Sequence, residues 1–129
     1  MIKSITKFAI VLMVFVQCSS SVVNKARHYK YDPLLILEEE ISASNLDNAH
    51  AFISWARPFW LRGTDFNSIK YSTVYYPYVY VNGNRYGDMT SLGSISIVNI
   101  SEMKFLRAID ATSRLGTDHR GGAILISRR

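Results

Sequence analysis

Residues 74–81, with the sequence VYYPYVYV, are the part of this chain that most clearly specifies a β-strand. Valine and tyrosine are favoured in strands, and their side chains alternate between the two faces of a sheet. Pro77 cannot donate a backbone hydrogen bond, which predicts that it lies at a sheet edge or at the beginning of a strand. Asn82-Gly83 is a strong hairpin signal, so residues 85–87 are expected to return as the neighbouring strand.

Apolar runs on either side of this hairpin predict three further strands. They cover residues 34–37 (LLIL), residues 104–109 (KFLRAI) and residues 123–127 (AILIS). Each is too short to cross a membrane as a helix, which takes about 20 residues. Gly121 and Gly122 introduce the last run. Because a continuous apolar strand is covered on both faces, this turn has to lead the chain into the sheet interior, where a side chain would clash or strain the backbone.

One helix is predicted between the first apolar run and the hairpin. Ser44 and Asp47 have the S-x-x-D spacing of a capping box at a helix start. Pro58 marks the end of this helix, because the residue before a proline avoids the helical region. The polar residues 62–68 (RGTDFNS) are then expected to form a loop. One apolar stripe at helical spacing is expected to face the core, and its members are Leu46, Ala49, Ile53 and Ala56.

Two shorter helical segments complete the pattern. The acidic residues 38–40 suit a helix start, and residues 110–115 (DATSRL) fit a short helix that Gly116 ends. Strands alternating with short helices in 129 residues indicate one small α/β or α+β domain with a mixed sheet. A connection between residues 104–109 and residues 123–127 would be a right-handed crossover if those strands were parallel. The expected buried side chains are Leu35, Ile53, Val79, Val81, Phe105, Leu106, Ile124 and Ile126.

The N-terminal residues have the layout of an export signal. Lys3 and Lys7 form a positive start, residues 8–16 (FAIVLMVFV) are an unbroken apolar run, and small polar residues follow. Residues 1–17 are therefore predicted to be a signal peptide. This stretch resembles a bacterial lipoprotein leader, which implies that Cys18 is cut free as the first mature residue and lipidated, so that the protein is anchored to a membrane. An ordinary cleaved leader with an incidental cysteine is the alternative.

Charge is distributed unevenly along the chain. Residues 1–31 contain five lysines and arginines and no acidic residue, whereas residues 32–129 contain ten basic and ten acidic residues. Residues 18–31 are expected to form a tether and residues 32–129 the folded domain. The neutral charge of that domain argues against nucleic acid as a partner, because phosphate binding needs a basic surface.

Residues that usually carry catalysis or metal binding are sparse. His28, His50 and His119 are not at metal-ligand spacing, and a single cysteine can build neither a disulfide nor a multi-cysteine metal cage. No cofactor, metal or catalytic residue is therefore expected. Asp118 beside His119 could serve a hydrolase, but adjacent residues rarely converge on one substrate atom. A solvated loop is the simpler interpretation of both residues.

The tyrosines between Tyr71 and Tyr80 are the best candidates for binding. A tyrosine presents a broad apolar face with a polar tip, which suits contacts with sugars or proteins. Tyr76, Tyr78 and Tyr80 are therefore the candidate binding residues. Two interpretations remain open: an exposed binding face, or a strand packed under a helix with only its hydroxyl groups in water.

Four segments of the C-terminal half carry a family resemblance. They are residues 79–85 (VYVNGNR), 100–108 (ISEMKFLRA), 110–116 (DATSRLG) and 121–128 (GGAILISR). Their order and spacing resemble the plug domain of TonB-dependent outer-membrane receptors, whose corresponding pieces are a "vyvDGv" strand, an "IesIevlrg" segment, a short helix and "GGvIlItTk". Asn82 replaces the usual aspartate.

Two upstream segments extend this resemblance to about residues 34–129. Residues 36–41 (ILEEEI) and residues 57–62 (RPFWLR) are similar to the "I-x-x-x-E-I" and "RPxWLR" patterns of small exported proteins that are only plug-like. In a receptor a β-barrel follows the plug, whereas this sequence stops at Arg129. Transport is therefore not expected to carry over, since a plug alone cannot form the barrel.

The resemblance implies a single plug-like domain in an exported, non-catalytic lipoprotein at the outer membrane. It would act by contacts with an outer-membrane receptor or another envelope protein, and its lipid would hold it on the periplasmic or the outer surface. The alternative function is a glycan- or peptide-binding surface module that uses the aromatic cluster from Tyr71 to Tyr80.

Overall fold

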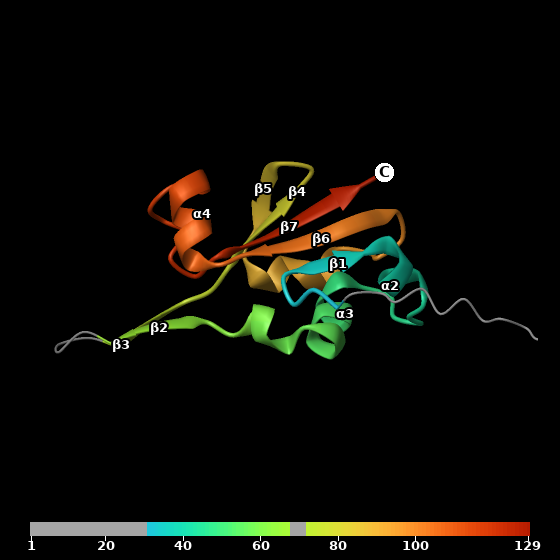
Figure 1. The fold of residues 1–129 in the computed structure, drawn as a ribbon, viewed down its shortest axis with the longest axis horizontal. Helices are drawn as coiled ribbons and strands as arrows, with labels where there is room; N and C mark the ends of the chain where they lie inside the picture. The colour runs from blue at the N-terminus through green and yellow to red at the C-terminus, as the bar shows by residue number, and fades with distance from the viewer. Residues whose placement is uncertain (1–30, 68–71) are drawn as a thin grey trace, which may run out of the picture. The chain divides into compact units, whose positions relative to one another are not determined.

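A mixed five-stranded sheet with the strand order β1-β6-β7-β4-β5 organises the computed structural model, which describes residues 31–67 and 72–129 (Figure 1). Its strands are β1 (Leu35–Leu37), β4 (Tyr78–Val81), β5 (Asn84–Gly87), β6 (Ile100–Leu106) and β7 (Ala123–Arg128). A separate two-stranded sheet pairs β2 (Thr64–Asn67) with β3 (Ser72–Tyr75). The helices are α2 (Glu38–Ser42), α3 (Ala49–Ala56) and α4 (Ala108–Leu115), and the 3₁₀ helices are η1 (Pro58–Leu61) and η2 (Met89–Ser94). The domain is therefore a small α+β domain, as predicted.

The pairing of the central strands depends on both local and distant contacts. Asn82 and Gly83 have φ angles of 49° and 82° and form the predicted hairpin between β4 and β5. Strand β7 lies between β4, which is parallel to it, and β6, which is antiparallel. Leu106 at the end of β6 is opposite Ala123 at the start of β7. The chain therefore turns back at one end of the sheet, and the crossover considered between these two segments does not form.

Each face of the sheet is covered by a different set of helices. Helix α3 with η1 and η2 covers one face, and α4 lies on the opposite face (Figure 1). The smaller core under α4 consists of Leu106, Ala111 and Ala123, with Tyr80 and Leu125 packed against it. The larger core under α3 is formed by buried side chains that include Ile36, Phe52, Ile53, Trp60, Val79, Met103, Ile124 and Ile126.

Five of the eight expected core residues are buried, and three are not. Leu35, Val81 and Phe105 are only partly covered, whereas Ile36 is fully buried. The reason is the register of β1, which places Ile36 opposite Met103 on the face under α3. Leu35 is its neighbour in the strand and points to the other face.

Three predicted boundaries are wrong. Residues 64–67 form β2 rather than part of a loop, because they pair with β3. The expected strand over residues 74–81 is divided at Tyr76-Pro77 into the end of β3 and the whole of β4. The strand expected over residues 104–109 runs from Ile100 to Leu106 as β6, and Ala108 and Ile109 begin α4 instead.

The start of α3 also differs from the prediction. Its N-cap is Asn48, whose Oδ1 accepts a hydrogen bond from the backbone N–H of Ala51 at 2.8 Å. Ser44 does not cap this helix, because its hydroxyl donates to the carbonyl of Ile41 at the end of α2. The predicted end is confirmed, with Arg57 as the C-cap before Pro58.

The described residues contain no helix that is both long enough and apolar enough to span a bilayer. The predicted signal peptide, the lipidation site Cys18 and most of the tether lie outside the described residues.

Candidate functional site

The candidate tyrosines differ in their surroundings. Tyr78 and Tyr80 project from β4 on the face that α4 covers, with the predicted alternation against Val79 and Val81. Both are half-buried. Tyr76 precedes this strand and is 52% exposed. The three residues therefore do not form one exposed aromatic surface.

His119 belongs to the loop of residues 117–120, which follows α4, and its buried side chain holds this loop against β4. Only 4% of it is exposed. Its Nδ1 lies 3.1 Å from the carbonyl oxygen of Gly116, and its Nε2 lies 2.7 Å from the hydroxyl of Tyr80. Because a carbonyl can only accept, Nδ1 donates to Gly116, and in the tautomer with its proton on Nδ1 the Nε2 atom accepts from the Tyr80 hydroxyl. The expectation of a solvated histidine is wrong, since the loop folds back over the tyrosines.

The glycine pair fixes the other end of this loop, as predicted. Gly122 has a φ angle of 91°, and a Cβ on it would lie 2.6 Å from the carbonyl oxygen of Leu106. A Cβ on Gly121 would collide with the backbone carbonyl of Tyr76. The turn thus brings the loop tightly against the chain that enters β4.

A pocket of about 290 Å³ lies between this loop and the tyrosines, lined by Tyr75, Tyr78, Thr117, Asp118 and Arg120. Thr117, Asp118 and Arg120 flank the buried His119 and are themselves exposed. The pocket therefore combines aromatic walls with hydrogen-bonding groups of both charges.

Two arginines lie over tyrosine rings of this pocket, Arg85 in close contact and Arg120 at longer cation–π range. The guanidinium carbon of Arg85 lies 3.7 Å from the centroid of the Tyr78 ring, and that of Arg120 lies 5.7 Å from the centroid of Tyr75. Both arginines are exposed. Stacked guanidinium groups keep their N–H donors at the edge of the plane, where a ligand can reach them. We call Tyr75, Tyr78, Arg85, Asp118 and Arg120 the tyrosine–arginine site.

The geometry separates the tyrosine–arginine site from the catalytic arrangement considered for Asp118 and His119. Asp118 is exposed, whereas both ring nitrogens of His119 are engaged with Tyr80 and Gly116. Tyr76 is exposed beside the loop but does not line the pocket. Across residues 31–67 and 72–129, no three acidic, histidine or cysteine side chains are grouped as metal ligands.

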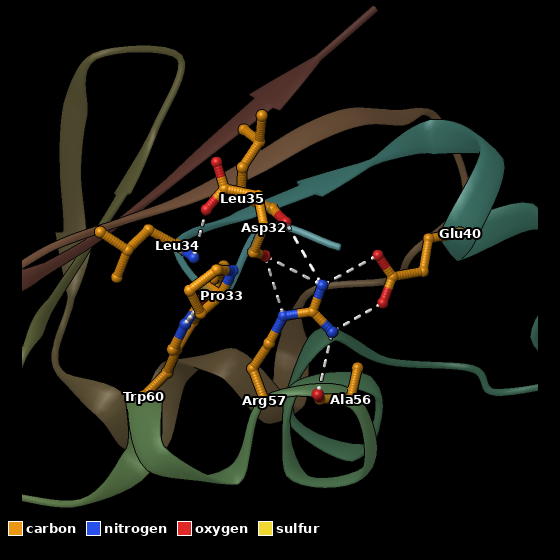
Figure 2. A network of polar contacts seen from close by, with 8 residues as sticks. All are labelled: Asp32, Pro33, Leu34, Leu35, Glu40, Ala56, Arg57 and Trp60. Carbon is orange, nitrogen blue, oxygen red and sulfur yellow. Dashed lines mark hydrogen bonds and ion pairs between the residues drawn. The ribbon is translucent and has the colours of Figure 1, made fainter. Parts of the chain in front are cut away.

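A second polar cluster is buried at the opposite face of the sheet, around Arg57 (Figure 2). Two of its nitrogens donate to the two carboxylate oxygens of Glu40 at 2.8 and 3.1 Å, which makes a bidentate ion pair. The remaining donors reach the carbonyl oxygens of Asp32, Leu35 and Ala56. This arginine therefore fastens the first described residues to the end of α3.

The pairing of Glu40 with Arg57 is not predicted from the sequence. Glu40 is predicted at a helix start and Arg57 at a helix end, and both positions are confirmed. The two upstream motifs, residues 36–41 and residues 57–62, each contain one partner of this ion pair, and their joint presence was the feature that could have indicated it. Trp60 of the second motif adds a hydrogen bond from its Nε1 to the carbonyl oxygen of Pro33 at 2.8 Å (Figure 2).

The four C-terminal segments that carry the resemblance lie next to one another in the structure. Residues 79–85 form most of the β4–β5 hairpin, residues 100–108 contain β6, residues 110–116 belong to α4 and its C-cap, and residues 121–128 lead into and form β7. Comparison with protein-family models, with curated proteins and with solved structures gives no match for the chain.

Proposed function

We propose that this protein is a non-catalytic, plug-like lipoprotein of the outer membrane that acts by binding another envelope protein. The observation that carries the proposal is the tyrosine–arginine site, where Arg120 lines a concave pocket and Arg85 is stacked on Tyr78 of the same pocket. Tyrosine and arginine are the residues most enriched at the energetic centres of protein interfaces. The predicted leader and the resemblance support the location at the outer membrane.

Binding explains this site better than catalysis does. The one histidine at the site uses both ring nitrogens for internal hydrogen bonds, with Tyr80 and with Gly116. A general base needs a free nitrogen within hydrogen-bond reach of the substrate. His119 instead positions Thr117, Asp118 and Arg120 around the pocket.

A protein segment suits the pocket better than a glycan. About 290 Å³ is at the lower limit of small-molecule pockets and is large enough for one or two side chains. Arg85 covers a face of Tyr78, so that face cannot stack on a sugar ring. Tyr76 next to the pocket is 52% exposed and would extend the contact surface. Glycan or peptide binding by a surface module stays the second candidate, because Asp118 and Thr117 could also bind hydroxyl groups.

Site-specific photo-cross-linking in cells tests the proposal. A photoreactive amino acid is placed at Tyr76 beside the pocket or, as a matched control, at the 67% exposed Trp55 of α3, which covers the other face of the sheet. We expect a discrete protein adduct in the outer-membrane fraction from position 76 and none from position 55. Adding Tyr78→Ala should weaken the position-76 adduct at least about tenfold, which corresponds to roughly 1.4 kcal/mol.

Two outcomes would count against this function. No protein adduct from position 76, or one that Tyr78→Ala leaves unchanged, overturns binding through the tyrosine–arginine site. A heterogeneous polysaccharide adduct in its place favours the glycan-binding alternative.

A further inference from the structure

Two cations of the tyrosine–arginine site have no acidic partner within the described parts of the chain. Arg85 and Arg120 lie over tyrosine rings, but neither forms an ion pair with a carboxylate among residues 31–67 and 72–129. Other arginines are paired: Arg57 binds Glu40, and Arg129 binds Glu38. The site therefore presents guanidinium donors that the fold itself does not use.

Arg85 is held in position by the β4–β5 hairpin. Its Cα is opposite that of Tyr80 in the strand register, which directs its side chain to the face shared by Tyr78 and Tyr80. The stacking on Tyr78 at 3.7 Å then restricts the guanidinium plane. The Asn82-Gly83 turn fixes this register, so the backbone that carries Arg85 is already ordered before a ligand binds.

Arg120 is positioned from the other side of the pocket. It is the residue after His119, whose burial and two hydrogen bonds anchor the loop. It is also the residue before Gly121, which is packed against the carbonyl of Tyr76. Arg120 thus lines the pocket itself, and Arg85, held on a separate element, lies over the ring of Tyr78, which is another lining residue.

We infer that the tyrosine–arginine site recognises a carboxylate of the partner protein, bound between the guanidinium groups of Arg85 and Arg120. This inference rests on the proposed function and adds the chemistry of the partner. Arginine suits a carboxylate because its planar N–H donors match the two oxygens. Asp118, which also lines the pocket, repels a second negative charge. It therefore disfavours a phosphate dianion, and it can accept a backbone N–H of the same partner segment.

Peptide titrations monitored by NMR test the inference on the intact domain. The probes are acetyl-Gly-Glu-Gly-amide for a side-chain carboxylate, acetyl-Gly-Gly-Gly with a free C-terminus for a terminal carboxylate, and acetyl-Gly-Gln-Gly-amide as the neutral control. We expect at least one carboxylate probe to bind about tenfold more tightly than the glutamine probe and to shift the Tyr78 and Arg85 resonances. Which of the two binds identifies the source of the carboxylate.

Charge-reversal variants provide the matched controls. Arg85→Glu and Arg120→Glu should each abolish this preference, whereas Lys104→Glu, an equal charge change at an exposed residue of β6, should keep it. The inference is overturned if neither carboxylate probe binds more tightly than the glutamine probe, or if inorganic phosphate binds as tightly as the carboxylate probe does. If the probes fail while the Tyr76 cross-link persists, only the carboxylate inference falls. If the cross-link itself is absent, the proposed function falls with it.

Discussion

At the scale of single residues, His119 shows how a polar loop residue becomes part of the core. It lies between exposed neighbours, yet its ring is buried and bonded to a hydroxyl 39 positions earlier in the chain. We expect His119→Ala to lower the free energy of unfolding by about 1–3 kcal/mol, because it removes a buried ring together with its two hydrogen bonds. Asp118→Ala should change it by less than about 0.5 kcal/mol. Urea denaturation of both variants measures the difference.

The Tyr80→Phe variant separates the hydrogen bond from the packing of the imidazole. It removes only the hydroxyl that donates to Nε2 of His119 and should account for part of the loss. A wild-type denaturation midpoint for His119→Ala would contradict the anchoring role of this residue.

The sequence predicts the glycine turn that ends the loop of residues 117–120, but it does not predict the burial of His119 in that loop. The tight turn at Gly121 and Gly122 was predictable, because a glycine pair directly before an apolar strand indicates a position where a side chain would not fit. Both glycines are closely packed in the structure. The burial of His119 could not, since the segment TDHR has the polarity of a solvated loop. The ring is buried because the loop packs on Tyr80, which is distant in the sequence. Pockets of this kind depend on side chains from segments that the sequence does not place together.

At the scale of secondary-structure elements, the ion pair of Arg57 and Glu40 joins α2 to the end of α3 (Figure 2). Removing one partner leaves the other as an uncompensated charge in a buried site. We expect Glu40→Gln or Arg57→Ala to lower the free energy of unfolding by about 3–5 kcal/mol. Glu40→Gln leaves the buried Arg57 charge unpaired, and Arg57→Ala also removes the hydrogen bonds of its guanidinium group to backbone carbonyl oxygens. Chemical denaturation followed by circular dichroism measures this loss.

The ion pair between Arg129 and Glu38 is the matched control. Its side chains are 63% and 39% exposed, so water screens their attraction. Arg129→Ala should therefore lower the free energy of unfolding by no more than about 1 kcal/mol. Equal losses from the buried and the exposed pair would refute the view that Arg57 fastens the N-terminal elements.

Elements with a local signal were the predictable ones. The β4–β5 hairpin follows from Asn82-Gly83, and the helix that ends at Gly116 follows from that glycine. Strand β2 was missed because Asp65, Asn67 and the preceding Gly63 are residue types that strands disfavour, and its strand conformation comes from pairing with β3. The N-cap at Asn48 was missed because two polar residues upstream, Ser44 and Asp47, offered a competing cap pattern.

At the scale of the whole molecule, composition and element order were sufficient to predict a small α+β domain, while the strand order was not. The parallel pairing of β4 with β7 joins segments about 45 residues apart, and no local pattern encodes it. Export, anchoring and the partner remain predictions, because they depend on Cys18 outside the described residues and on a surface whose ligand the sequence does not specify. What the fold adds is a positioned site on one face of the sheet.

The last prediction concerns how the domain stays at a membrane. Residues 32–129 carry equal numbers of basic and acidic residues, so their net charge provides no strong attraction to anionic lipids. Retention then depends on lipid at Cys18, on the basic residues of the tether or on a bound partner, and a high-salt wash removes the contribution of the tether. One acyl chain gives only marginal binding, at about 0.8 kcal/mol per buried CH₂, whereas several chains anchor firmly.

Mass spectrometry of the membrane fraction should therefore find Cys18 as an acylated N-terminus, and the protein should stay in this fraction after a high-salt wash. Cys18→Ser should lose the acyl mass and the retention while the thermal midpoint of the domain stays unchanged. A mature N-terminus beyond Cys18, with full release into the soluble fraction, would show that the leader is an ordinary export signal.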